Sequence, residues 1–325
     1  MTAMNPKLIA LDWGTSSLRG FLMGANGAVL EQRGSPHGIT ALPEPGTAGF
    51  EAAFEALCGE WLDRWPALPV VAGGMVGSSQ GWREAPYVRS PADVSRLAAE
   101  AMEVPTRRGL SILIAPGVLS HPSGGAPDVM RGEEIQIAGA LRLHPQLAER
   151  GHFLMPGTHS KWVDVRDGRI TGFETYMTGE LFAVLCRHSL LGRLMPAEAA
   201  APEVAEAAFT RGVEAARHSR PGDLAHQIFA ARTLGLTGEM PAAALRDFLS
   251  GLLIGQEVLS ALGHSAQADT PLALIGEEGL CRRYAGVLQR FGAVPALQLG
   301  NTAPAGLFHF AIAAGRVAAA GEPAR

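Results

Sequence analysis

Short apolar runs that end in turn residues open the chain. The runs at 8–11 and 18–23 predict two paired strands, and the run at 28–33 predicts a third strand beside them. The pattern then changes, because apolar residues recur at helical spacing over 50–65. The sequence therefore begins with a predicted antiparallel hairpin and its neighbour, followed by an amphipathic helix.

The first half of the chain continues as a mixture of strand and helix. Short apolar segments at 69–72 and 111–115 predict buried strands, and a helical pattern over 134–143 ends before Pro145. This alternation favours an α/β fold.

A second set of elements repeats the opening pattern and is richer in helix. An Asp-Gly pair at 167–168 predicts a tight turn between two of its strands. The tail from Ala303 is rich in alanine and predicts a helix that packs back on the first domain. The predicted strands are 152–155, 162–166, 169–174 and 272–275, and the predicted helices are 179–194, 203–216, 224–234, 241–262 and 280–291.

Composition narrows the class of protein. A chain of 325 residues with 47% hydrophobic and 18% charged residues can bury a large core, and its length favours two domains. The formal net charge of −4 supplies no basic field for nucleic acid or an anionic membrane. We expect neither partner.

Cysteine spacing and hydropathy bear on the compartment. Cys58, Cys186 and Cys281 lie far apart without metal-ligand spacing, which predicts reduced thiols in a cytoplasmic protein and no structural zinc. The N-terminus lacks a secretory apolar core, and the most apolar candidate helix, 307–320, carries His309 and an arginine. The sequence predicts no membrane segment.

Two strand–turn–strand units carry candidate phosphate chemistry. Each unit, "LDWGTSSLRG" and "MPGTHSKWVDVRDGRI", places Gly-Thr and further hydroxyl residues at its turn. Glycine amides and hydroxyls can cradle phosphate oxygens, although one such turn alone is ordinary hairpin chemistry. Asp12, at the end of the first strand, either holds Mg²⁺ through water or caps the turn. The P-loop and dinucleotide-binding motifs do not occur.

The segment "GSSQG" at 77–81 matches the pattern of a nucleophile elbow, which would favour a hydrolase. That motif requires a helix directly after the serine. Pro86 and Pro91 follow instead and predict a loop. We interpret the segment as a polar loop after a strand.

Five motifs in order resemble one family. "LDWGTSSLRG", "GGMVGSSQGW", "DVMRGEEIQIAGAL", "PGTHSKWV" and "YMTGELFAVL" are similar to the 2-dehydro-3-deoxygalactonokinase family of the actin, sugar kinase and Hsp70 superfamily, and the resemblance runs from Leu8 to about Ala320. It implies an α/β fold of two related ribonuclease-H-like domains flanking an ATP cleft. The domains would be 1–145, with the helix 303–325 packed back on it, and 146–302.

The resemblance also implies an activity. This would be transfer of the ATP γ-phosphate, with Mg²⁺, to the C6 hydroxyl of 2-dehydro-3-deoxy-D-galactonate in cytoplasmic galactonate catabolism. The partners would be ATP and a small sugar acid, without nucleic acid or membrane, and a homodimer is compatible with it. A phosphohydrolase and a non-catalytic protein that senses ATP or sugar remain alternatives in the same superfamily.

The resemblance suggests roles for particular residues. Glu133, at a helix start where the dipole favours the anion, would accept the hydroxyl proton, with Glu134 as the alternative. Lys161 either neutralises phosphate charge or projects into solvent, and His159 either donates to phosphate or is an ordinary turn residue. The implied ATP and phosphate ligands are Gly14, Thr15, Ser16, Gly157, Thr158, His159, Ser160, Lys161, Gly276 and Gly279.

Two further groups of residues concern the nucleoside and the acceptor. In "LALIGEEGL", Glu277 and Glu278 either bond ribose hydroxyls or cap the following helix. The acid substrate calls for an arginine; Arg131, beside the expected base, is preferred over Arg83 and Arg89. The implied acceptor contacts are Ser78, Ser79, Gln80 and Trp82.

Overall fold

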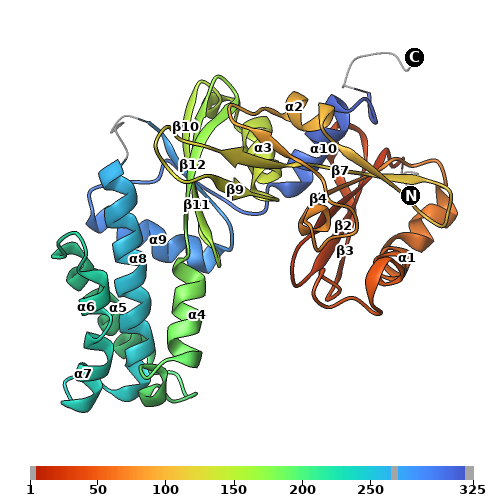
Figure 1. Cartoon of the computed structure of the whole chain (residues 1–325). Coiled ribbons are helices and arrows are strands. Elements are labelled where there is room, and N and C mark those ends of the chain that lie inside the picture. Colours follow the sequence, from red (N-terminus) through yellow and green to blue (C-terminus); the bar gives the residue numbers. More distant parts are fainter. Residues whose placement is uncertain (1–4, 265–269, 319–325) are drawn as a thin grey trace. The chain divides into compact units, whose positions relative to one another are not determined.

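The computed structural model describes residues 5–264 and 270–318, which form a mixed α/β structure (Figure 1). The chain divides into two compact units, each discontinuous in sequence. The first contains the described residues of 1–153, 163–173 and 301–325, and the second contains 154–162 and the described residues of 174–300. The boundaries of the two expected related domains, 145/146 and 302/303, stay a prediction.

The opening apolar runs form the centre of the first sheet. β1 pairs antiparallel with β2 and parallel with β4, and almost every residue of β1 is buried. The sheet order is β3-β2-β1-β4-β7-β6. Its strands are β1 (Leu8–Trp13), β2 (Leu18–Met23), β3 (Val29–Ser35), β4 (Val70–Gly74), β6 (Met102–Pro105) and β7 (Ser111–Ile114).

The second sheet shares the first part of that order. It runs β12-β11-β10-β13-β14, so both sheets place their first three strands in the order 3-2-1 with the fourth strand beside the first. The first sheet then continues with β7 and β6, and the second with β14. The Asp-Gly turn joins β11 and β12 with positive φ at Asp167 and Gly168, as its sequence predicts. The strands are β10 (Arg150–Met155), β11 (Ser160–Arg166), β12 (Arg169–Tyr176), β13 (Leu272–Ile275) and β14 (Leu297–Leu299). This shared 3-2-1-4 order is ribonuclease-H-like and confirms the predicted fold class.

Helices and a small third sheet complete the first unit. The predicted helix over 50–65 is α1, which packs Phe50, Phe54 and Trp61 into the core of the first sheet. The small sheet has the order β5-β8-β9. These elements are α1 (Gly46–Arg64), α2 (Val94–Ala99), α3 (Glu133–Leu143), α10 (Ala303–Ala313), β5 (Tyr87–Arg89), β8 (Gly117–Ser120) and β9 (Asp128–Met130).

The remaining helices belong to the second unit, and two differ from expectation. The helix predicted over 179–194 ends at His188, because the Ser189 hydroxyl donates to the carbonyl of Leu185 and accepts from the amide of Leu191. The helix predicted over 224–234 is two short helices. The elements are α4 (Thr178–His188), α5 (Pro202–Arg217), α6 (Leu224–Gln227), α7 (Ala230–Leu236), α8 (Leu245–His264) and α9 (Glu278–Arg290).

The C-terminal tail packs on the first unit, as the sequence predicts. The tail forms α10, which packs against α3 in the first unit (Figure 1). The predicted helix over 303–325 is too long, because α10 ends at Ala313 and residues 314–318 form turns and bends, with a positive φ of 68° at Gly315. Residues 319–325 lie outside the described residues.

Within 5–264 and 270–318, no helix combines the length and the hydrophobicity needed to span a bilayer.

A pair of glycines allows α3 and α10 to approach backbone to backbone. A Cβ on Gly306 would overlap the carbonyl oxygen of Ile135, and a Cβ on Gly139 would overlap that of Thr302. The Thr302 hydroxyl also donates to the Gln136 carbonyl at 2.6 Å. This contact fixes the tail helix onto α3.

We therefore expect Gly306→Ala to lower the free energy of unfolding by about 1–3 kcal/mol, because a backbone oxygen cannot move aside as a side chain can. Gly286→Ala is the matched control. Gly286 lies on α9 with open space around it, so alanine there should add up to about 1 kcal/mol through helix propensity. Urea unfolding of both variants measures the difference, and equal effects would contradict the close contact.

Candidate active site

The first predicted phosphate turn, between β1 and β2, exposes its hydroxyls but uses its glycine internally. Thr15 and Ser16 are exposed. The amide of Gly14 donates to the carbonyl of Ser17 at 2.9 Å, so the expectation that this amide faces phosphate is wrong for this conformation. The carbonyl of Thr15 accepts from the amide and the hydroxyl of Thr40, which braces the turn.

Asp12 is held by a cross-strand partner. Its Oδ2 accepts from Arg19 Nη2 at 2.5 Å, and the two residues face each other in the β1–β2 register. Burial raises the pKa of Asp12, and the Arg19 charge opposes that rise. Within the described chain, no group of three or more His, Cys, Asp or Glu side chains could hold a metal ion. One carboxylate fits Mg²⁺ bound through water and nucleotide phosphates, rather than through a protein cage.

The two glutamates at the start of α3 have different environments. Glu133 is partly exposed, and its carboxylate accepts from the Arg131 amide at 3.1 Å. Glu134 has 0% exposure, and both its oxygens accept from the Gly132 amide, at 2.9 and 2.7 Å. Burial, with the nearby Glu133 charge, raises the pKa of Glu134 to about 8. Glu133 is accessible to a substrate, whereas Glu134 is enclosed.

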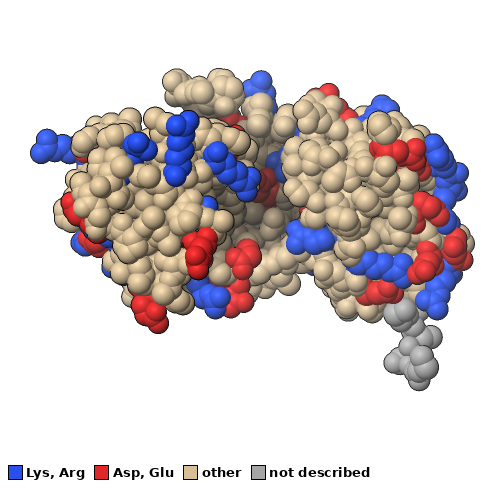
Figure 2. Space-filling model, turned by 90° about the horizontal axis from the view of Figure 1, so that it is seen from below, with Lys and Arg blue, Asp and Glu red and all other residues tan. Residues whose placement is uncertain are grey.

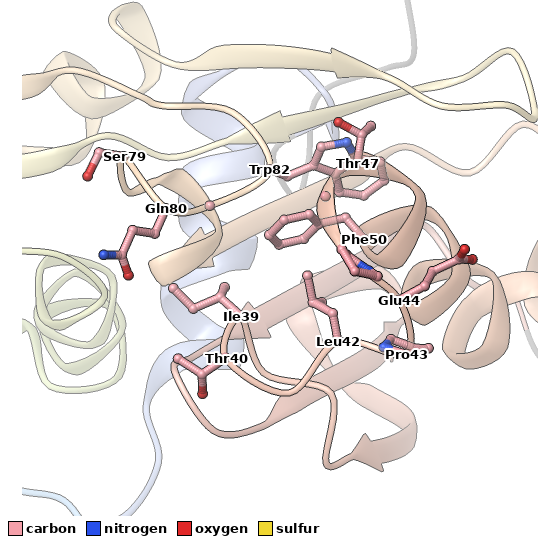
Figure 3. Close-up of a pocket in the computed structure, with 13 residues that line it drawn as sticks. Ile39, Thr40, Leu42, Pro43, Glu44, Thr47, Phe50, Ser79, Gln80 and Trp82 are labelled. Atoms are coloured by element: carbon pink, nitrogen blue, oxygen red, sulfur yellow. The ribbon is translucent and has the colours of Figure 1, made fainter.

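A first pocket, of about 510 Å³, lies within the first unit (Figure 3). Trp82 stacks on Phe50, with ring centroids 5.8 Å apart and planes 18° apart. Ser79 and Gln80 are exposed and reach the pocket from the loop after β4. The pocket is lined by Ile39, Thr40, Leu42, Pro43, Glu44, Pro45, Gly46, Thr47, Phe50, Ser79, Gln80, Gly81 and Trp82. Three of the four predicted acceptor contacts therefore line one cavity.

The fourth predicted contact, Ser78, is buried, and so is Arg131. Arg131 Nη2 donates to the Ala85 carbonyl at 2.8 Å, and the guanidinium lies 4.4 Å from the Tyr87 ring centroid. As far as the chain is described, Ser78 Oγ and the Nε and Nη1 of Arg131 are buried without hydrogen-bond partners. Unsatisfied buried donors are costly and mark a place where a ligand would be stabilised. The alternatives Arg83 and Arg89 are exposed.

The loop "GSSQG" has the predicted irregular structure. A single 3₁₀ turn at Met75–Gly77 precedes Ser78, and turns and bends connect it to β5. The helix that a nucleophile elbow requires does not follow the serine.

A second pocket, of about 620 Å³, lies within the second unit. The turn between β10 and β11 reaches it through Gly157 and Thr158, and the first residues of α4 and α9 lie beside that turn. Helix N-termini present unpaired amides and a positive dipole end to anions. The lining residues are Gly157, Thr158, Thr178, Gly179, Phe182, Arg246, Asp247, Ser250, Leu253, Ile254, Glu277, Gly279, Leu280, Arg283 and Tyr284.

Three other residues of the second turn can be compared with their expected roles. Lys161 is only 5% exposed, and its Nζ donates to Thr175 Oγ1 at 2.6 Å, so projection into solvent is wrong. Ser160 has 0% exposure, and its hydroxyl bonds Tyr284, so direct contact with phosphate is wrong in this conformation. His159 is exposed and pairs with Glu180. The pattern of hydroxyls does not reveal which of them face inward.

The predicted nucleoside segment adopts the capping alternative. Glu277 accepts from the amides of Gly279 and Leu280, at 2.8 and 2.7 Å, and so caps α9. Glu278 pairs with Arg282 on the same helix. Gly279 lines the second pocket, and Gly276 has a φ of 154° and donates to the carbonyl of Leu299 at 3.2 Å.

The α8 contribution to the second pocket was not predicted from the sequence. Arg246, Ser250 and Ile254 recur every four residues on one face of α8, and that face lines the pocket. The polar residues Arg246, Asp247 and Ser250 near the start of an apolar helix were the available signal.

Charged residues show no single-sign field on the face drawn in Figure 2, where Lys and Arg are interspersed with Asp and Glu.

The three cysteines, Cys58, Cys186 and Cys281, are free thiols.

Comparison with known proteins gives the family. The model of the family 2-keto-3-deoxy-galactonokinase matches residues 12–310. The chain belongs to this family.

Relatives of this 2-keto-3-deoxy-galactonokinase family member match it along nearly their whole length. A Rhizobium meliloti (strain 1021) protein named "Probable 2-dehydro-3-deoxygalactonokinase DgoK1" is 40% identical over 306 residues, 92% of this chain and 94% of its own. The 2-dehydro-3-deoxygalactonokinase of Escherichia coli (strain K12) is 37% identical, covering 92% and 95%. The crystal structure of a Sinorhizobium meliloti protein assigned the same activity has a TM-score of 0.81 at 36% identity, covering 94% and 98%.

The enclosed Glu134 of this family member predicts a pH dependence of stability. Because folding raises its pKa from 4.5 to about 8, the folded state favours the protonated form, and ionisation lowers the free energy of unfolding as pH rises between those values. Glu134→Gln keeps the shape without the charge, so the stability of the wild type should fall by up to about 1.4 kcal/mol per pH unit relative to the variant. Urea unfolding from pH 5 to 8 tests this, and parallel curves would contradict it.

Proposed function

We propose that this kinase family member transfers the γ-phosphate of ATP to the C6 hydroxyl of 2-dehydro-3-deoxy-D-galactonate. The second pocket carries the structural part of the proposal, because a hydroxyl-bearing turn and the starts of two helices line one cavity. The family membership and the names of the relatives support the acceptor.

The second pocket has the chemistry that a nucleoside triphosphate needs. Gly157 and Thr158, with the start of α4, would take the phosphates, since Glu277 already caps the first amides of α9. The apolar side chains Phe182, Leu253 and Ile254 would take the base. Phosphoryl transfer requires mainly such positioning and charge stabilisation.

The first pocket suits a small polyhydroxylated acid. Its stacked Phe50 and Trp82 offer a flat apolar wall, and Ser79 and Gln80 offer hydrogen bonds to hydroxyls. Arg131 does not line this pocket, and its unpartnered Nε and Nη1 would supply charge-assisted donors for the acid group.

Glu133 is the proposed base. It is the accessible one of the two glutamates, and the N-terminus of α3 favours its anionic form. Asp12 would hold Mg²⁺ through water, and the bound ion would neutralise phosphate charge during transfer. Reduced thiols and the use of ATP support a cytoplasmic location, and a homodimer is the proposed assembly.

We expect ADP release to depend on the acceptor. The purified chain with ATP and Mg²⁺ should release ADP with 2-dehydro-3-deoxy-D-galactonate, slowly with its gluconate epimer and not with neutral hexoses, and mass analysis should give a monophosphate. ADP release that ignores every acceptor would favour a phosphohydrolase. Binding of ATP or sugar without turnover would favour a sensing protein.

Glu133→Gln should lower kcat by about 10²-fold or more, because the amide cannot accept the hydroxyl proton, while the affinity for ADP stays the same. Steady-state kinetics and calorimetric titration measure the two quantities. Glu203→Gln, which changes an exposed glutamate in the first turn of α5, is the control and should leave both unchanged. Near-normal turnover of Glu133→Gln would exclude Glu133 as the base.

A further inference from the structure

Glu257 is a carboxylate inside the second unit, on the same helix that lines the second pocket. It is 3% exposed. Its Oε1 accepts from Trp162 Nε1 at 2.9 Å, and its Oε2 accepts from the Tyr284 hydroxyl at 2.6 Å. The Ser160 hydroxyl in turn bonds the Tyr284 hydroxyl at 3.1 Å. Burial raises the pKa of Glu257, and its hydrogen bonds oppose that rise.

The residues around Glu257 come from the elements that form the second pocket. Ser160 and Trp162 lie on β11, directly after the turn that carries Gly157 and Thr158. Thr178 is the first residue of α4, and Tyr284 lies on α9. Thr178 and Tyr284 themselves line the pocket. One carboxylate therefore connects the strand after the turn with α9, and the turn in its place holds the start of α4, because the Glu180 amide donates to the Thr158 carbonyl at 3.0 Å.

A buried carboxylate is a poor choice for stability alone. Removing it from water is costly, and an apolar side chain of the same size is often as good. The advantage of a carboxylate over an apolar side chain is that it fixes the direction of its neighbours, because each donor has to point at one of its two oxygens. Trp162 can only donate, so it fixes the direction of Oε1, and the Tyr284 hydroxyl then fixes Oε2.

We propose that Glu257 is a positioning residue for nucleotide binding: it holds the turn 157–159, the start of α4 and α9 in the arrangement that receives the nucleotide phosphates. The inference rests on the proposed function, since it takes the second pocket as the ATP site. Glu257 does not line that pocket, so it acts through the residues that it holds.

Glu257→Gln is the first test. Glutamine keeps the volume and can still accept from Trp162, but its amide nitrogen cannot accept from Tyr284. We expect the Kd for ADP and the KM for ATP to rise about tenfold, with the KM for the sugar acid unchanged. Calorimetric titration of ADP into the full chain and steady-state kinetics give these values.

A second variant separates action through Glu257 from direct contact with the nucleotide. Ser160 is fully buried, so Ser160→Ala can weaken ADP binding only through the cluster, and we expect about a threefold rise in Kd. In the double variant, Ser160→Ala should add little to Glu257→Gln. If the rise in Kd of the double variant equals the product of the two single-variant rises, the inference is overturned. An unchanged Kd in Ser160→Ala alone would also overturn it, whether or not Glu257→Gln folds.

The control is a buried glutamate in the first unit. Glu51 on α1 is 9% exposed and accepts from the Arg107 amide at 3.1 Å, so Glu51→Gln should affect thermal stability without affecting ADP affinity. If the wild type binds ADP and Glu257→Gln binds it within twofold, this inference alone is overturned. If the wild type binds neither ADP nor ATP, the proposed function is overturned and the inference with it.

Discussion

The cost of removing carboxylates from water constrains the loops of this protein. Asp12, Glu134 and Glu257 are withdrawn from solvent, and each accepts hydrogen bonds from a segment near the candidate site: Arg19 across the first hairpin, the Gly132 amide before α3, and Trp162 after the second turn. A buried carboxylate without donors would be strongly unfavourable. Each segment must therefore adopt the conformation that presents its donor, and the accessible residues beside it are fixed as a result.

Much of the fold could be predicted because several of its helices and strands have a clear apolar pattern or are joined by a distinctive turn. The apolar runs of β1 and β2, the Asp-Gly turn at 167–168 and the helical spacing of α1 each depend on local chemistry. The strands that the sequence analysis missed, β5, β6, β8, β9 and β14, have three or four residues each, which is too short for a period of two to stand out. Tertiary pairing, rather than local pattern, creates them.

The candidate site was predictable in its location but not in the direction of its side chains. Thr15, Thr158, Gln80 and Trp82 are accessible where the motifs place them. Four consecutive residues of β11, 160–163, are buried, so both faces of the strand are covered and alternation cannot say which hydroxyl faces a ligand. Ser160 and Thr158 have the same chemistry in sequence and opposite exposures in the structure.

The opposite face of α8 explains why a single helix can supply both pocket-lining residues and the buried carboxylate. α8 packs along α5 (Figure 1). There a Cβ on Gly251 would overlap the carbonyl oxygen of Phe209, and one on Gly212 would overlap that of Phe248. Helices in such contact cannot rotate past each other without a backbone clash. The glycine contact therefore fixes the direction of Glu257, and Glu257 in turn fixes the turn and helix starts that line the second pocket.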